Sequence, residues 1–122
     1  MVLSTDAGRG GLKRHKDTSA ADTSLTLTTP APLRGKTQKL LWVAVKYSAP
    51  PAHSGVTIGI NSGAGAAFDF NLVTGNANDE DFFWESDGGE FKLLNDDAVE
   101  VVAPGGGGVI TATIMVMMQE AE

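Results

Sequence analysis

Few side chains in this sequence could carry out a chemical reaction. Cysteine is absent, which excludes thiolate metal sites, cysteine nucleophiles and disulfides. The candidate general bases are His15, in a polar basic segment, and His53, in a proline-rich turn, and neither position is preorganised. Ser62 lacks the glycine two residues earlier that a nucleophile elbow requires. We therefore expect a protein that is not an enzyme and that needs no cofactor.

Three stretches resemble ligand sites only in part. Gly63–Phe68 and Gly105–Gly108 lack the residues that complete a phosphate-binding loop, and neither pattern opens a helix, so both are interpreted as turns. Asn76–Asp81 offers oxygen ligands that suit calcium, but it lacks the glycine and the distal glutamate of a calcium loop. A solvated acidic turn is the preferred interpretation, and a bound cation stays open.

An aromatic group flanked by Asp81 and Glu85 could form a sugar-binding platform, because aromatic faces stack on pyranose rings while carboxylates bind the hydroxyls. Its members are Trp42, Phe82, Phe83, Trp84 and Phe91. In a small sandwich such residues are more often core or interface. A carbohydrate-binding or adhesin module is therefore kept as an alternative function.

Charge is divided unevenly along the chain, which has a net charge of −6. Residues 1–46 hold eight basic and three acidic residues, whereas residues 47–122 hold one basic residue, Lys92, and twelve acidic ones. An acidic body repels phosphates, which argues against nucleic acid as a partner. The uneven division of charge suits a basic segment that lies on an acidic neighbour. An acidic surface also favours solubility without any partner.

The composition predicts an all-β protein, because 15 glycines, 5 prolines and many threonines and valines accompany no helical periodicity. We predict an antiparallel β-sandwich or jelly roll of about eight strands, formed by residues 23–122, with an extended, flexible N-terminal arm at residues 1–22. No segment has the length of a membrane helix or the pattern of a signal peptide. We expect synthesis in the cytoplasm and no membrane partner.

The predicted strands are short and separated by turn residues. The last two are expected to pair as a hairpin across the four glycines, and the two aromatic strands as a hairpin across Asp87-Gly88-Gly89. The predicted spans are Thr23–Thr29, Leu40–Tyr47, Val56–Asn61, Ala67–Leu72, Phe82–Trp84, Phe91–Leu94, Val99–Ala103 and Val109–Met118.

Two of these strands, Leu40–Tyr47 and Val109–Met118, are apolar on both faces. An isolated two-layer sandwich leaves one face of each sheet in water, so such strands must be covered from outside. We expect another subunit to provide this cover, with an interface formed by Trp42, Met115, Met117 and Met118.

The whole pattern resembles the small β-sandwich structural proteins of tailed-bacteriophage virions, in particular capsid decoration (cement) proteins. The likeness lies in the residue 1–22 segment, the Leu40–Tyr47 strand, the acidic aromatic stretch around Phe82–Trp84 and the glycine-linked C-terminal strands. It implies a homo-oligomer, typically a trimer, on the outer surface of a capsid. It also implies that the major capsid protein or another virion protein is the partner, and that an arm with Arg9, Lys13, Arg14 and Lys16 binds the coat. A neck or tail component of a virion is the alternative within this class.

Overall fold

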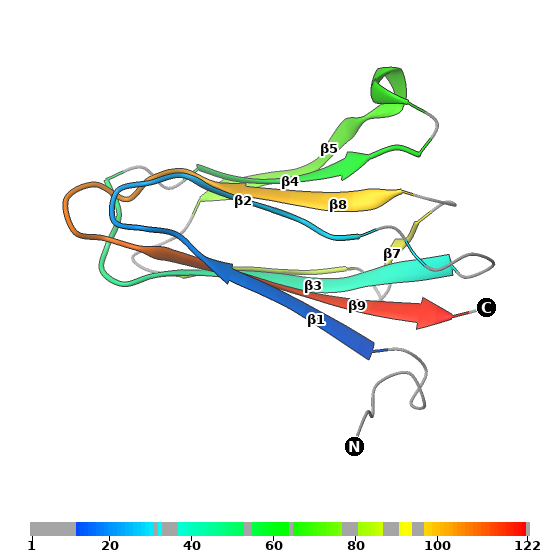
Figure 1. Cartoon of the computed structure of the whole chain (residues 1–122), viewed down its shortest axis with the longest axis horizontal. Helices are drawn as coiled ribbons and strands as arrows, with labels where there is room; N and C mark the ends of the chain where they lie inside the picture. The colour runs from blue at the N-terminus through cyan, green and yellow to red at the C-terminus, as the bar shows by residue number, and fades with distance from the viewer. Residues whose placement is uncertain are drawn as a thin grey trace.

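The computed structural model describes residues 12–30, 32, 37–52, 55–63, 65–76, 81–86, 91–93 and 97–121. These residues form two antiparallel sheets that pack face to face (Figure 1). The strands are β1 (Leu12–Thr18), β2 (Leu25–Thr28), β3 (Thr37–Tyr47), β4 (Gly55–Asn61), β5 (Phe70–Asn76), β6 (Asp81–Glu85), β7 (Phe91–Lys92), β8 (Ala98–Ala103) and β9 (Ala112–Ala121). A 3-10 turn, Ala66–Phe68, precedes β5. The predicted all-β sandwich is confirmed.

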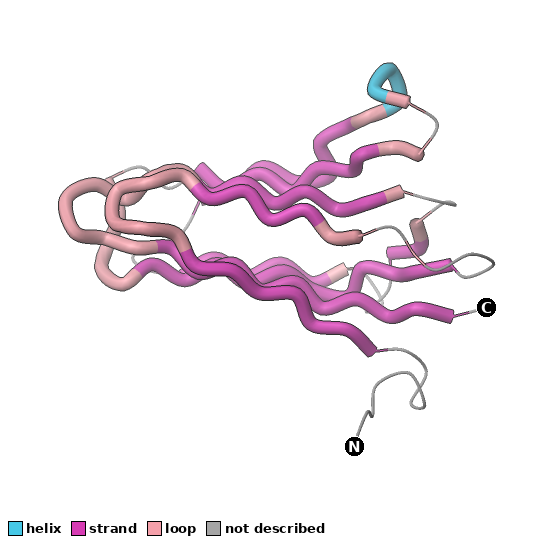
Figure 2. Tube along the Cα trace, in the orientation of Figure 1, coloured by secondary structure: helices cyan, strands magenta, loops and turns pink. Residues whose placement is uncertain are grey.

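The strand order identifies the sandwich as a jelly roll. One sheet has the order β1-β9-β3-β6 and the other β2-β8-β4-β5, while β7 pairs with β3 beside β6. Several strands that follow each other in the chain, such as β1 and β2 or β3 and β4, therefore lie in opposite sheets, whereas β4 and β5 pair directly. Figure 2 shows that the loops from β1 to β2 and from β8 to β9, which join the two layers, lie at the same end of the sandwich.

The predicted C-terminal hairpin is wrong, because β8 and β9 belong to different sheets. β8 pairs with β2 and β4, whereas β9 pairs with β1 and β3. The glycine-rich connection crosses between the layers and packs tightly there. A Cβ atom on Gly106 would lie 2.5 Å from Cγ2 of Ile110, and the hydroxyl of buried Tyr47 donates a 2.7 Å hydrogen bond to the Pro104 carbonyl. Burial raises the pKa of Tyr47, so the fold favours its neutral phenol.

The predicted hairpin of the two aromatic strands is also wrong. β6 and β7 both pair with β3, β6 along Trp42–Lys46 and β7 at Lys39 and Leu40, and not with each other. The turn residues proposed to join them, 87–90, lie outside the described residues. A long β3 can therefore take two short partners end to end along one edge.

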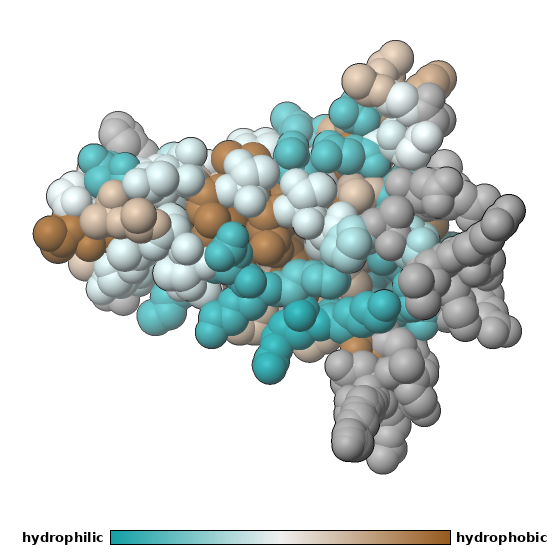
Figure 3. Space-filling model, viewed as in Figure 1, coloured by the Kyte–Doolittle hydropathy of each residue, from teal (hydrophilic) through white to brown (hydrophobic). Residues whose placement is uncertain are grey.

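The extended arm was predicted to reach Asp22, but β1 is an integral edge strand. It pairs with β9 over all seven of its residues, from Leu12 opposite Gln119 to Thr18 opposite Thr113. Because most of its side chains are charged, the sequence pattern does not predict this strand. Charges are nevertheless typical of the edge of a sheet, where they discourage pairing with other chains. Figure 3 shows hydrophilic side chains along β1, below the hydrophobic core that is visible between the sheets. Residues 1–11 lie outside the described residues.

The core lies between the two sheets and is built from alternate residues of the central strands. Val43, Val45 and Tyr47 of β3 face Val56, Ile58 and Ile60 of β4 in one buried cluster. In β3 the alternation changes phase at a bulge, because Leu40 pairs with Met118 and Trp42 pairs with Met117. Leu41 is the extra residue, and its carbonyl accepts a hydrogen bond from the backbone of Ser86. As a result both Leu40 and Val43 point inward.

Candidate functional site

The outer face of the β1-β9-β3-β6 sheet is apolar at its centre. Trp42 and Ala44 of β3 lie beside Met117 and Met115 of β9, and Ala44 lies beside Phe83 of β6. We call these five residues the Trp42 face. The structure thus places the apolar outer residues of the two strands on one continuous surface, as their sequences indicated. A sheet that faces solvent would carry polar residues there.

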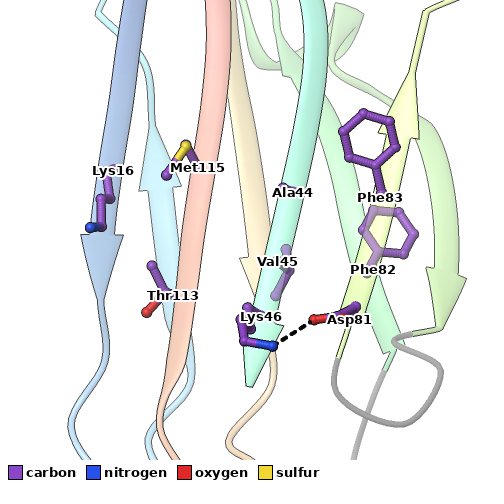
Figure 4. Close-up of a pocket in the computed structure, with 9 residues that line it drawn as sticks. All are labelled: Lys16, Ala44, Val45, Lys46, Asp81, Phe82, Phe83, Thr113 and Met115. Carbon is purple, nitrogen blue, oxygen red and sulfur yellow. Dashed lines mark hydrogen bonds and ion pairs between the residues drawn. The ribbon is translucent and has the colours of Figure 1, made fainter. Parts of the chain in front are cut away.

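The Trp42 face contains a hollow of about 510 Å³ above Ala44 (Figure 4). The short alanine side chain lies between the longer Met115 and Phe83 on the neighbouring strands. Lys16, Thr113 and the ion pair between Lys46 and Asp81, with Nζ and Oδ1 3.2 Å apart, also line the hollow. The site is therefore an apolar depression with a charged rim.

The aromatic group predicted from the sequence is divided between the two sides of the sheet. Trp42 and Phe83 lie on the outside with ring centroids 5.9 Å apart, and Phe83 is 60 % exposed. Phe82, Trp84 and Phe91 pack against the core instead. Gly75 of β5 makes room for Phe82, because a Cβ there would lie 2.6 Å from Cε1 of its ring. A sugar platform would retain only Trp42 and Phe83.

Cations surround the Trp42 face although the protein as a whole is acidic. The strand register places Arg14 and Lys16 of β1 at one edge, in line with Met117 and Met115. The remaining charged residues that share this side are Lys39, Lys46, Lys92, Asp81 and Glu85. Among the described residues, cations outnumber carboxylates on this side, which suits a partner with an acidic surface.

Two predicted site residues do not belong to this face. Met118 is 1 % exposed and lies in the core opposite Leu40, so its prediction as an interface residue is wrong. Lys13 pairs with Met118 across the strands, and its Nζ lies 3.3 Å from Oε1 of Glu120. Arg9 lies outside the described residues. Arg14 and Lys16 are positioned by the sheet, and not by a free arm.

His15 lies on the inner side of β1 beside buried Val116. Burial lowers the pKa of His15 below its ordinary value of 6.5, and the charge of Lys13 lowers it further. The unfolded chain then binds this proton more readily than the folded one, so the free energy of unfolding has its full value above pH 6.5 and falls as the pH drops from 6.5 through the lowered pKa of the folded state.

We expect acidification from pH 7.5 to pH 5 to reduce the free energy of unfolding more in the natural protein than in the His15→Gln variant. Glutamine cannot take up the proton that drives this loss. Urea unfolding of both proteins across that range checks the prediction. Parallel pH profiles would contradict it.

The outer face of the other sheet is polar, as expected for a surface in water. Thr26 and Thr28 of β2, Glu100 of β8 and Thr57 of β4 point outward there, and Val102 of β8 is an apolar residue among them. A smaller hollow of about 300 Å³ at Gly59 is lined mainly by polar residues, among them Asn61, Asn71 and Glu100. The apolar character of the Trp42 face is therefore specific to one side of the sandwich.

The described residues show no other centre for chemistry. No three potential metal-ligating side chains come together in this part of the chain. Of the proposed cation loop Asn76–Asp81, residues 77–80 lie outside the description, as does His53. None of the described helical structure is long and apolar enough to span a bilayer.

Neither the protein-family models nor the curated proteins gave a sequence match to this chain. Solved structures resemble it at 11–16 % identity. Among them is PirA, with a TM-score of 0.48 over 85 % of this chain and 92 % of that one. A family 32 carbohydrate-binding module from C. perfringens NanJ, in complex with galactose, has a TM-score of 0.47 over 85 % and 93 %. The SPBc2 prophage-derived protein YomS has 0.39 over 87 % and 94 %. These values identify no family and assign no function.

Proposed function

We propose that this protein is a non-enzymatic structural protein of a tailed-phage virion, a capsid decoration protein that binds the coat lattice from outside. The observation that carries the proposal is the Trp42 face. Trp42, Met115 and Met117 lie on the outer side of a sheet whose inner side already forms the core. Such a surface is stabilised by a protein partner, because aromatic and methionine side chains contribute most of the contact energy in interfaces.

The charges support a protein partner over nucleic acid. Arg14 and Lys16 at the rim favour an acidic surface, while the net charge of −6 opposes binding to a phosphate backbone. The jelly roll is also a fold that capsid proteins use, although the fold alone assigns no role. The resemblance in sequence to decoration proteins directs the proposal to the capsid surface.

The location of the protein in the particle tests this function. We expect antibodies raised against the purified protein to label purified virions of the encoding phage over the whole shell in electron micrographs. Label confined to the neck or tail would replace decoration with the neck or tail role. Virions without label would overturn the virion assignment itself.

A further inference from the structure

The register of the sheet arranges the outward side chains of the Trp42 face and its edges in rows across four strands. Each row runs from β1 through β9 and β3 to β6, because residues opposite each other in the ladder share one face. One row contains Lys16, Met115, Ala44 and Phe83, and the next contains Arg14, Met117, Trp42 and Glu85.

Charge is graded along these rows. The cations Arg14 and Lys16 lie at the β1 edge, whereas the carboxylates of Asp81 and Glu85 lie at the β6 edge. Three strand spacings separate Arg14 from Glu85, which is roughly 14 Å, so the two side chains do not pair within one chain. Asp81 is already paired with Lys46, and Lys92 lies farther along the same edge of β3, so the opposite charges at the two ends of one row are those of Arg14 and Glu85.

We infer that the Trp42 face binds a second copy of this chain, related to the first by a two-fold axis that runs parallel to the strands between β9 and β3. The inference rests on the proposed role of this face as a protein-binding surface. Such an axis places β1 over β6 of the second copy and β9 over β3 of the second copy. The same surface is then used on both chains, and the assembly closes at two copies.

The rows are complementary across this axis. Met115 lies over the partner's Ala44, so that its flexible side chain enters the hollow above that residue. Lys16 lies over the exposed ring of the partner's Phe83, which allows a cation–π contact. Arg14 lies over the partner's Glu85, and symmetry repeats each contact.

Other orientations lose this complementarity. A two-fold axis perpendicular to the strands would place β1 over β1 and β6 over β6, and would bring Arg14 against the partner's Arg14. Like charges opposed in this way disfavour association. The opposite charges of Arg14 and Glu85 therefore favour a face-to-face dimer over the trimer expected from the sequence.

Charge exchange tests the dimer. We expect light scattering to give twice the 12.7 kDa chain mass for the natural protein. Arg14→Glu and Glu85→Arg should each weaken association about ten-fold, because each places like charges together twice per dimer. The double variant should regain the natural affinity, since every pair is re-formed in reverse. Glu100→Arg, on the opposite sheet, is the control and should leave the mass unchanged.

A natural protein that stays monomeric or forms trimers would overturn the two-fold dimer, as would a double variant no tighter than the single ones. Both charges lie on exposed side chains, and circular dichroism of each variant checks that the sandwich is retained. A failure to find the dimer would not overturn the proposed virion location, because antibody labelling tests that location separately.

Discussion

Replacing Tyr47 with alanine is expected to remove about 3–5 kcal/mol from the free energy of unfolding, which is a large share of the roughly 5–15 kcal/mol typical of a domain. Tyr47 is fully buried at the end of β3, and its ring lies against the close-packed Gly106. The alanine variant leaves a cavity and deprives the Pro104 carbonyl of its donor. Both losses occur where the chain crosses from β8 to β9.

Urea unfolding followed by circular dichroism measures this effect. Tyr47→Phe is the matched control, because it keeps the ring and removes only the hydroxyl, for a loss of about 1–3 kcal/mol. Phe68→Ala should change stability by less than about 0.5 kcal/mol, since Phe68 is 64 % exposed. A Tyr47→Ala variant as stable as the phenylalanine variant would show that the crossover does not depend on this ring.

Replacing Ala44 with glutamate is expected to abolish assembly while leaving the sandwich folded. The longer, charged side chain would fill the hollow between Met115 and Phe83 and would bring a carboxylate into the apolar centre. Central interface positions commonly contribute 2 kcal/mol or more, so we expect self-association to weaken by at least about thirty-fold. Incorporation into virions should fall with it.

Light scattering of the purified variant and its recovery with virions measure the two effects. Thr57→Glu is the matched control, because Thr57 also points outward from a central strand but lies on the polar sheet. We expect that control to assemble normally. If Ala44→Glu assembled as well as Thr57→Glu, the Trp42 face would not be the binding surface.

Composition and two-residue periodicity alone predicted the class of fold and the positions of most strands. Val56, Ile58 and Ile60 alternate with small or polar residues, and the structure buries these three. The same periodicity separated Met115 and Met117 from Ile114 and Val116, and so indicated the outer apolar face. These are local properties, because a side chain's face follows directly from its place in a strand.

The tertiary structure decided which strands pair with each other. A glycine-rich link between two apolar strands fits a hairpin and a crossover equally well. The pairing of β8 with β2 and β4, and of β9 with β1 and β3, places the two strands in different sheets. The charged segment Leu12–Thr18 has no periodic apolar pattern, and it becomes a strand because the edge of β9 needs hydrogen-bond partners.

The bulge at Leu41 is a second tertiary decision, because it turns Leu40 inward, where strict alternation with Trp42 would point it out. Met118 lies in the core, and not in the interface predicted for it, because it shares the inner side of β9 with Ile114 and Val116, and the bulge brings Leu40 opposite to it. The sequence by itself thus determined that this chain forms a sandwich with one apolar outer face. The tertiary structure decided which strands share a sheet and which edges carry the charges, because hydrogen bonding between distant strands depends on contacts that no local pattern records.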